Sequence, residues 1–131
     1  MRPGRTEGGH RIDEARMELE NLAESLGQSL SGDPWHGPSM AALLADVTPE
    51  DAMSQPVAGA HSIIDLVLHL AAWTQEVGSR LRGNPPALPA LGTGVTVAAM
   101  LAGLARHDAY HGGQIAILKR ALAARRANET V

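Results

Sequence analysis

The 131-residue sequence has no cysteine, no phenylalanine and only three aromatic residues, Trp35, Trp73 and Tyr110. Without cysteine the chain has no disulfide framework, no cysteine-ligated zinc site and no thiol nucleophile. Any metal ion must therefore be held by histidine or carboxylate side chains. The scarcity of aromatic rings also removes the stacking surfaces that single-strand nucleic-acid binders need.

The sequence also lacks a positive charge excess and long apolar runs. Eleven Lys and Arg face fourteen Asp and Glu, and this net charge of −3 argues against general nucleic-acid binding. The N-terminal residues MRPGRTEGGH do not form a signal peptide, and no stretch approaches the roughly 18 apolar residues of a membrane span. We therefore expect no nucleic-acid partner, no membrane association and a cytoplasmic location. The basic residues near the C-terminus are typical of a helix end that complements its dipole: Lys119, Arg120, Arg125 and Arg126.

Length and composition indicate a single domain. A mass of 13.7 kDa with 44% hydrophobic and 19% charged residues is typical of one globular unit. We expect a flexible N-terminal tail over residues 1–9, one helical domain over residues 10–127 and a C-terminal tail over residues 128–131.

Apolar residues recur every three or four positions in three segments, as on one face of a helix. This spacing predicts long helices from Ile12 to Leu30, from Ser62 to about Arg82 and from about Val95 to Arg126. There is no β alternation of useful length and no internal repeat. The predicted fold class is therefore all-α, with a helix bundle as its architecture.

The segments between the long helices carry turn and cap signals. Short helical pieces are predicted after Ser39 and after Thr48, which are typical N-cap residues. Residues 83–94 are rich in proline and glycine and are predicted to be a linker. The run from Ile63 to Trp73 is apolar on almost every side, so this helix is predicted to be buried on most faces.

Two histidines, His107 and His111, occupy the apolar seam of the last predicted helix. A separation of four residues places both imidazoles on one face, within reach of one metal ion. Such a pair also arises by chance, but burying two imidazoles costs free energy unless they are hydrogen-bonded or coordinated. Gln114 either orients a ligand or is solvated, and Asp108 is expected to be a surface charge. The other histidines are expected at the surface or beside caps: His10, His36 and His61.

His69 is the candidate for a third ligand. It lies 13 residues before Arg82, and His107 lies 13 residues after Gly94, so each is about 20 Å from the linker. In an antiparallel hairpin the two side chains stand at the same height and can share an ion. The alternative is a core histidine hydrogen-bonded to a carbonyl or to Asp65. Three imidazoles would leave a fourth position open, as in catalytic metal sites.

Five segments carry a further signal: Trp35–Ser39, Val47–Glu50, Gly59–Ile63, Leu66–Trp73 and His107–Ile115. In this order, and over most of residues 12–122, they resemble the DinB-like family of metal-binding four-helix-bundle proteins. In that family a histidine of the second helix and an HxxxH pair of the last helix bind one divalent transition ion, often zinc or nickel. The resemblance assigns these roles to His69, His107 and His111.

The resemblance also implies chemistry. Relatives include bacillithiol and mycothiol S-transferases and mycothiol-dependent maleylpyruvate isomerase, in which the metal stabilises the thiolate of a cosubstrate. It thus implies a metal-dependent thiol S-transferase or hydrolase, with a metal-bound water or thiolate as the reactive group. The partners would be a low-molecular-weight thiol and a small electrophile. The alternative is a non-catalytic, metal-binding or stress-related dimeric helical protein, because family membership alone does not establish catalysis.

The sequence departs from the family where a long third helix is usual. Only residues 70–106 separate His69 from the HxxxH pair, and the linker at 83–94 stands in place of that helix. We expect a shortened bundle of three main helices plus short helical pieces. A flank of the second long helix would then be exposed, which predicts a homodimer whose second chain covers the gap and completes or blocks the metal site. A mobile linker beside the metal would favour a lid over substrate, whereas a packed one would favour a structural role.

Overall fold

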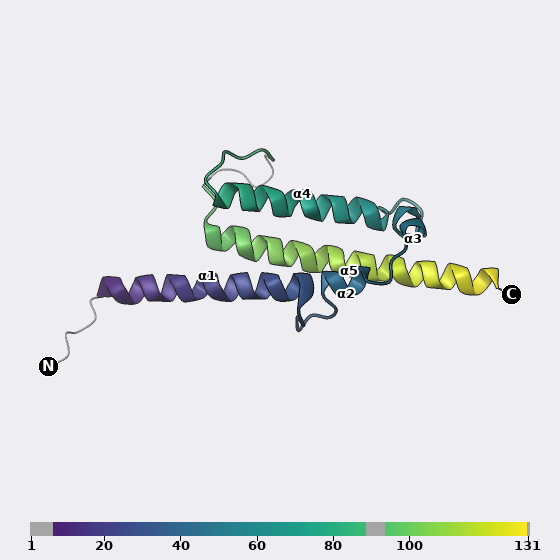
Figure 1. The fold of residues 1–131 in the computed structure, drawn as a ribbon, viewed down its shortest axis with the longest axis horizontal. Helices are drawn as coiled ribbons and strands as arrows, with labels where there is room; N and C mark the ends of the chain where they lie inside the picture. The colour runs from purple at the N-terminus through teal and green to yellow at the C-terminus, as the bar shows by residue number, and fades with distance from the viewer. Residues whose placement is uncertain (1–6, 89–93, 131) are drawn as a thin grey trace.

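The computed structural model describes residues 7–88 and 94–130, and every regular element within them is a helix. Three are long, α1 (Glu7–Ser31), α4 (Ile63–Leu81) and α5 (Val97–Glu129), and two are short, α2 (Met40–Leu44) and α3 (Pro49–Met53). The predicted all-α class is confirmed. Helices α4 and α5 lie side by side and antiparallel, and α1 packs on the other side of α5 in the same direction as α5 (Figure 1). None of the described helices combines the length and apolar character that crossing a membrane requires.

Capping side chains set the helix starts. The Ser62 hydroxyl accepts from the Asp65 amide at 3.2 Å, and the Asp65 carboxylate accepts from the Ser62 amide at 3.0 Å. This reciprocal pair satisfies two of the free amides at the start of α4. The hydroxyls of Ser39 and Thr48 cap α2 and α3 by accepting from the Ala42 and Asp51 amides. The predicted capping residues are therefore confirmed.

Helix α1 begins at Glu7, five residues before the predicted Ile12, so residues 7–9 of the predicted tail are helical. Residues 1–6 of that tail lie outside the described residues. In this extension His10 Nε2 lies 3.1 Å from the Glu14 carboxylate one turn further on, and the first turn contains the acidic residue Glu7. Both features favour continued helix and oppose the low propensity of Gly8.

Helix α5 ends at Glu129, beyond the predicted end at Arg126, so the predicted tail is helical at residues 128 and 129. Val131 lies outside the described residues. Alanine is the best helix former and is frequent in this last part of α5. Arg126 is also ion-paired with Asp51 of α3, which ties the final turns to the rest of the fold.

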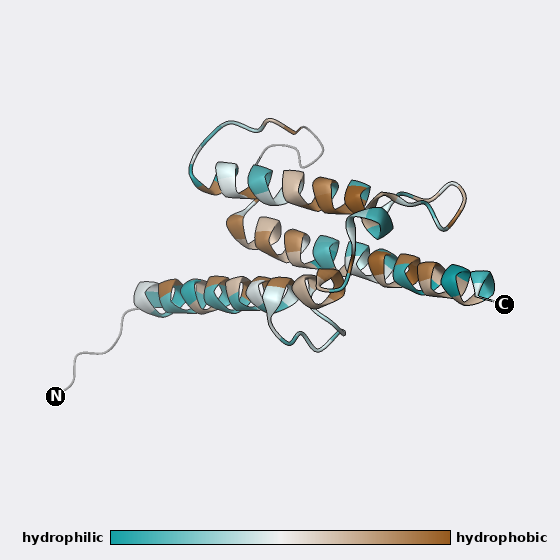
Figure 2. Ribbon diagram, turned by 45° about the vertical axis from the view of Figure 1, so that its right-hand side comes forward, coloured by the Kyte–Doolittle hydropathy of each residue, from teal (hydrophilic) through white to brown (hydrophobic). Residues whose placement is uncertain are grey.

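Two apolar clusters hold the helices together. One contains Leu66, Leu70 and Ile115 and joins α4 to α5 and α2, whereas the other joins the opposite half of the pair through Val77 and Leu104. Figure 2 shows the corresponding pattern on α5, where a hydrophilic middle separates two hydrophobic stretches. The histidines of α5 lie in that middle, so apolar packing on both sides fixes their height against α4.

The outward side of α4 is exposed, which corrects the prediction that this helix is buried on most faces. Leu68 has 62% of its surface accessible, and Ala71 and Ala72 are also exposed. No described helix covers this side. The apolar composition that indicated burial therefore belongs to a helix with one flank that no described helix covers.

The first part of the predicted linker is anchored to α4. Gly83 ends the helix with a φ of 85°, a left-handed value that favours glycine. The buried Glu76 carboxylate accepts from Arg80 Nε at 2.6 Å and from the Ala87 amide at 3.0 Å. Arg80 donates in turn to the Leu88 carbonyl at 2.6 Å. Residues 83–88 are thus held in place, and residues 89–93 lie outside the described residues.

Candidate metal centre

The three predicted ligands converge between α4 and α5. His69 Nε2 lies 2.9 Å from His107 Nε2, which lies 3.1 Å from His111 Nε2. One ligand atom from each residue falls within 4.8 Å of the others. Two nitrogens bound to one tetrahedral zinc ion would stand about 3.3 Å apart, so the cluster is close to the required spacing. The common height of His69 and His107 also confirms the antiparallel hairpin.

Gln114 orients one of the imidazoles. Its Oε1 lies 2.5 Å from His111 Nδ1, and a carbonyl oxygen can only accept, so Nδ1 carries the proton. In this tautomer the Nε2 atom of His111 has a lone pair and faces His107 Nε2. This is the arrangement in which a second hydrogen bond fixes the tautomer of a metal-binding histidine. The orienting role weighed for Gln114 is therefore observed.

Burial and mutual proximity keep the other two imidazoles in their neutral form. Partial removal from water lowers the pKa of His69, and the neighbouring His111 and His61 lower it further. Removal from water also lowers the pKa of His107, followed by the effects of His111 and His69. A neutral imidazole has a lone pair to give to a metal ion, whereas a protonated one has none. The donor set thus fits a divalent transition ion at neutral pH.

We expect Gln114→Ala to lower the affinity for zinc by about 10-fold to 100-fold, since the hydrogen bond that fixes His111 is lost while all three ligands remain. Competition with a chromophoric chelator measures this change. Gln75→Ala, which alters an exposed glutamine on α4, is the matched control and is expected to bind like the parent protein. An unchanged affinity in Gln114→Ala would contradict the orienting role.

Asp108 is a correction to the sequence interpretation. It was expected at the surface, but it retains only 2% exposure, and neither carboxylate oxygen has a hydrogen-bond partner among the described residues. Burial raises its pKa to about 6, against an opposing effect of His111. It lines a cavity of about 170 Å³ with Ser29 and His36, on the side of α5 that faces α1 and α2. The signal that could have found it is its position four residues after Leu104 and four before Gly112, both buried.

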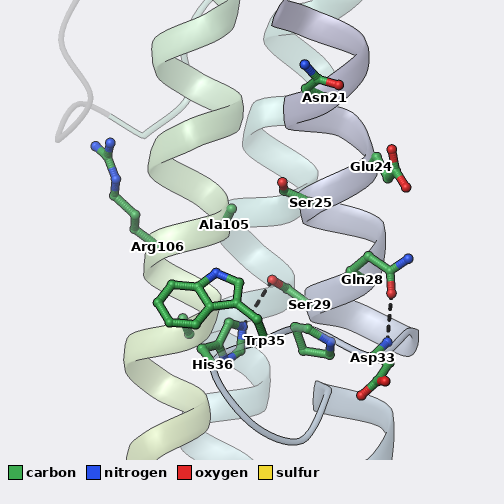
Figure 3. Close-up of a pocket in the computed structure, with 12 residues that line it drawn as sticks. Asn21, Glu24, Ser25, Gln28, Ser29, Asp33, Trp35, His36, Ala105 and Arg106 are labelled. Atoms are coloured by element: carbon green, nitrogen blue, oxygen red, sulfur yellow. Dashed lines mark hydrogen bonds between the residues drawn. The ribbon is translucent and has the colours of Figure 1, made fainter.

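The remaining histidines lie outside the cluster, as expected. His36 Nε2 is 3.4 Å from the Ser29 hydroxyl, beside a groove of about 720 Å³ between α1 and α5 (Figure 3). Trp35 stands at this groove with 99% of its surface exposed. None of the three clustered histidines lines the groove. It is therefore separate from the candidate metal centre.

A second cavity adjoins the cluster and was not predicted. It measures about 270 Å³ and reaches from His69 and His107 along α4 and α5 to Val77 and Met100. Trp73 forms one wall, with its ring centroid 6.4 Å from that of His69 and 6.3 Å from that of His107. Its position four residues after His69 on the same helix is the sequence signal for this contact.

A comparison with family models relates this geometry to known proteins. Residues 35–94 match the DinB superfamily. Over these residues the chain is similar to the DinB superfamily. The match includes α4 with the candidate ligand His69, whereas the other two candidates, His107 and His111, lie beyond its end. No curated protein and no solved structure matches the chain significantly.

Proposed function

We propose that this DinB-like protein binds one divalent transition ion, zinc or nickel, through His69, His107 and His111. We further propose that it is a metal-dependent enzyme of the thiol S-transferase or hydrolase type. The observation that carries the proposal is the convergence of three histidine Nε2 atoms at one point between α4 and α5. When bound, the ion supplies a Lewis acid that lowers the pKa of a thiol or of water.

The chain's own residues would hold and orient the reacting groups. His69 is exposed, whereas His107 and His111 are half-buried, so the cluster is open on the α4 side. A low-molecular-weight thiol and a small electrophile can approach from there. Gln114 keeps His111 in the tautomer that this chemistry requires. Trp73 provides an apolar wall beside the cluster.

Metal content per chain tests this proposal. We expect elemental analysis of untagged protein, purified without chelator, to find about one zinc or nickel ion per chain. His111→Ala is expected to lose the ion, and His10→Ala, which changes an exposed histidine of α1, is expected to keep it. No ion in the parent protein after incubation with zinc and nickel would overturn the proposal.

A non-catalytic metal-binding role is the second candidate, and one observation favours it. Apart from His69 and His107, which the proposal assigns to the metal ion, the cavity beside the cluster is lined by no side chain that could act as a general acid or base. The two candidates differ in turnover. If the protein is an enzyme, the zinc-loaded parent protein should accelerate the reaction of a small thiol with 1-chloro-2,4-dinitrobenzene, and His111→Ala should not. Equal rates for both proteins would favour the non-catalytic role.

We also propose that the protein is a homodimer. The chain exposes 9156 Å², whereas a compact monomer of 13.7 kDa exposes about 6,600 Å². Even if every residue outside the described ranges were fully exposed, an excess on the order of 1,000 Å² would remain, which is enough for a stable interface. Apolar side chains account for part of this excess area: Leu68 on α4 is 62% exposed and Ile12 on α1 is 71% exposed. The first half of α1 also projects past the start of α5 (Figure 1).

We expect light scattering to give about 27 kDa, twice the chain mass, for the parent protein. Ile12→Glu and Leu68→Glu are each expected to shift the mass towards 13.7 kDa, because a buried unpaired charge opposes association. Asn21→Glu adds the same charge on the opposite side of α1 and is expected to leave the dimer intact. A monomeric parent protein would contradict this proposal without affecting the metal site.

A further inference from the structure

We propose that the 270 Å³ cavity beside His69 and His107 binds the apolar, uncharged part of a small electrophilic substrate. This inference rests on the proposed function, because it assigns a substrate class to the same metal centre. It concerns the electrophile, whereas the thiol reaches the cluster from the exposed side of His69.

The composition of the cavity defines the chemistry that it accepts. Beyond the two histidines, the wall consists of Trp73, Val77, Met100 and Leu104, with Gly103 between the last two. Val77, Met100 and Leu104 belong to one buried apolar cluster, so their positions are fixed by packing. Apart from the two proposed ligands His69 and His107, no lining residue has an ionisable side chain. A charged group placed here would lose its hydration without gaining a partner.

Gly103 is the residue that leaves the cavity open. It lies four residues before His107, on the same face of α5, and a Cβ atom added to it would meet no heavy atom within 4 Å. Glycine inside a helix is less favourable than alanine, so this position weakens α5 locally while providing space. An apolar cavity of about 150 Å³ is already large enough for benzene, so this one can hold a substituted ring or a branched aliphatic group.

The cavity shares two residues with the candidate metal centre, so a molecule bound in the cavity is placed to react at that centre. His69 and His107 line the cavity and also provide two of the three converging nitrogens. A group seated against Trp73 and Leu104 therefore ends at the cluster, where a reactive carbon attached to it would meet the thiol. Holding the apolar group in this way orients the electrophile before reaction.

Two small thiols test this inference on the cobalt-substituted protein, as probes of the cavity and not as cosubstrates. A thiolate coordinated to cobalt gives a charge-transfer absorption band, and an apolar group attached to its sulfur can reach the adjoining cavity. Benzyl mercaptan carries an apolar ring, and 2-mercaptoethanesulfonate carries a charge. We expect benzyl mercaptan to bind at least tenfold more tightly. Gly103→Leu, which fills the cavity, is expected to abolish this preference while binding cobalt like the parent protein, and Gly103→Ala, which changes helix propensity with little filling, is expected to retain most of it.

A second readout separates failure of the inference from failure of the proposed function. In a Trp35→Phe background, Trp73 is the sole tryptophan, and its fluorescence reports cavity binding in metal-free protein. Quenching by benzyl mercaptan in this background but not in its Gly103→Leu variant would support the cavity even if no cobalt were bound. Equal affinities of the two thiols, or a preference that survives in Gly103→Leu, would overturn the inference. Absence of quenching in the parent background would overturn it as well, since the cavity would then be filled by the protein itself.

Discussion

His107→Ala is expected to lower the affinity for zinc by about 10³-fold, or about 4 kcal/mol. His107 is the middle nitrogen of the cluster, with His69 at 2.9 Å and His111 at 3.1 Å. Its removal leaves one ligand on each of two helices, separated by the vacated space. Isothermal titration with zinc, or chelator competition where binding is too tight, measures the difference.

The control for this change is His61→Ala, which removes an exposed imidazole close to the start of α4. We expect it to bind zinc like the parent protein. Metal-free His107→Ala should retain the helical circular-dichroism signal, because the two apolar clusters that flank the site are untouched. Tight zinc binding by His107→Ala would show that these three histidines are not the ligand set.

Asp108→Asn is expected to stabilise the metal-free protein by up to about 3 kcal/mol at pH 7.5. The carboxylate is buried without a hydrogen-bond partner among the described residues, and burial raises its pKa from 3.8 to about 6. Ionising it in the folded state therefore costs free energy that the unfolded chain does not pay. Asparagine has almost the same shape and carries no charge.

The pH dependence of that difference follows from the direction of the pKa shift. A folded-state pKa raised above its ordinary value means that the native protein binds the proton more tightly, so this group stabilises most below pH 4. Its contribution is lost as the pH rises to about 6. The lowered pKa values of His69 and His107 act in the opposite direction, with stability lost below pH 6.5, but they are common to both proteins.

Urea unfolding at pH 4.5 and pH 7.5 in the presence of a chelator measures both effects. The Asp108→Asn variant should exceed the parent protein clearly at pH 7.5 and only slightly at pH 4.5. Asp33→Asn, at an exposed position, should match the parent at both pH values. A variant that is less stable than the parent at pH 7.5 would show that the Asp108 carboxylate has a favourable partner in solution.

The candidate site could be predicted from the sequence because helix geometry is regular. The spacing of His107 and His111 and the equal distances of His69 and His107 from the linker depend only on rise and turn per residue. Capping residues such as Ser62 act within one turn, so they too were predictable. The orienting role of Gln114, three residues from His111, could be weighed for the same reason, beside the alternative of a solvated position.

The burial of Asp108 and the apolar cavity depend on how the helices pack against one another. The apolar periodicity of α5 predicts a single buried face, so it could not predict that packing. Helix α5 lies between α4 on one side and α1 with α2 on the other, so it has two buried faces. Asp108 belongs to the second face, which a single-face interpretation assigns to solvent. The space beside Gly103 likewise exists only because α4 contributes Trp73 to the opposite wall.

The contact between His69 and His107 spans 38 residues of a chain without cysteine. An ion held there would act as a removable cross-link that ties α4 to α5 and closes the intervening loop. A covalent bridge over a loop of that length would stabilise the folded chain by about 4 kcal/mol by restricting the unfolded one. The protein would thus gain, from a ligand it can exchange, the kind of restraint that secreted domains obtain from disulfides, and its stability would follow the supply of metal.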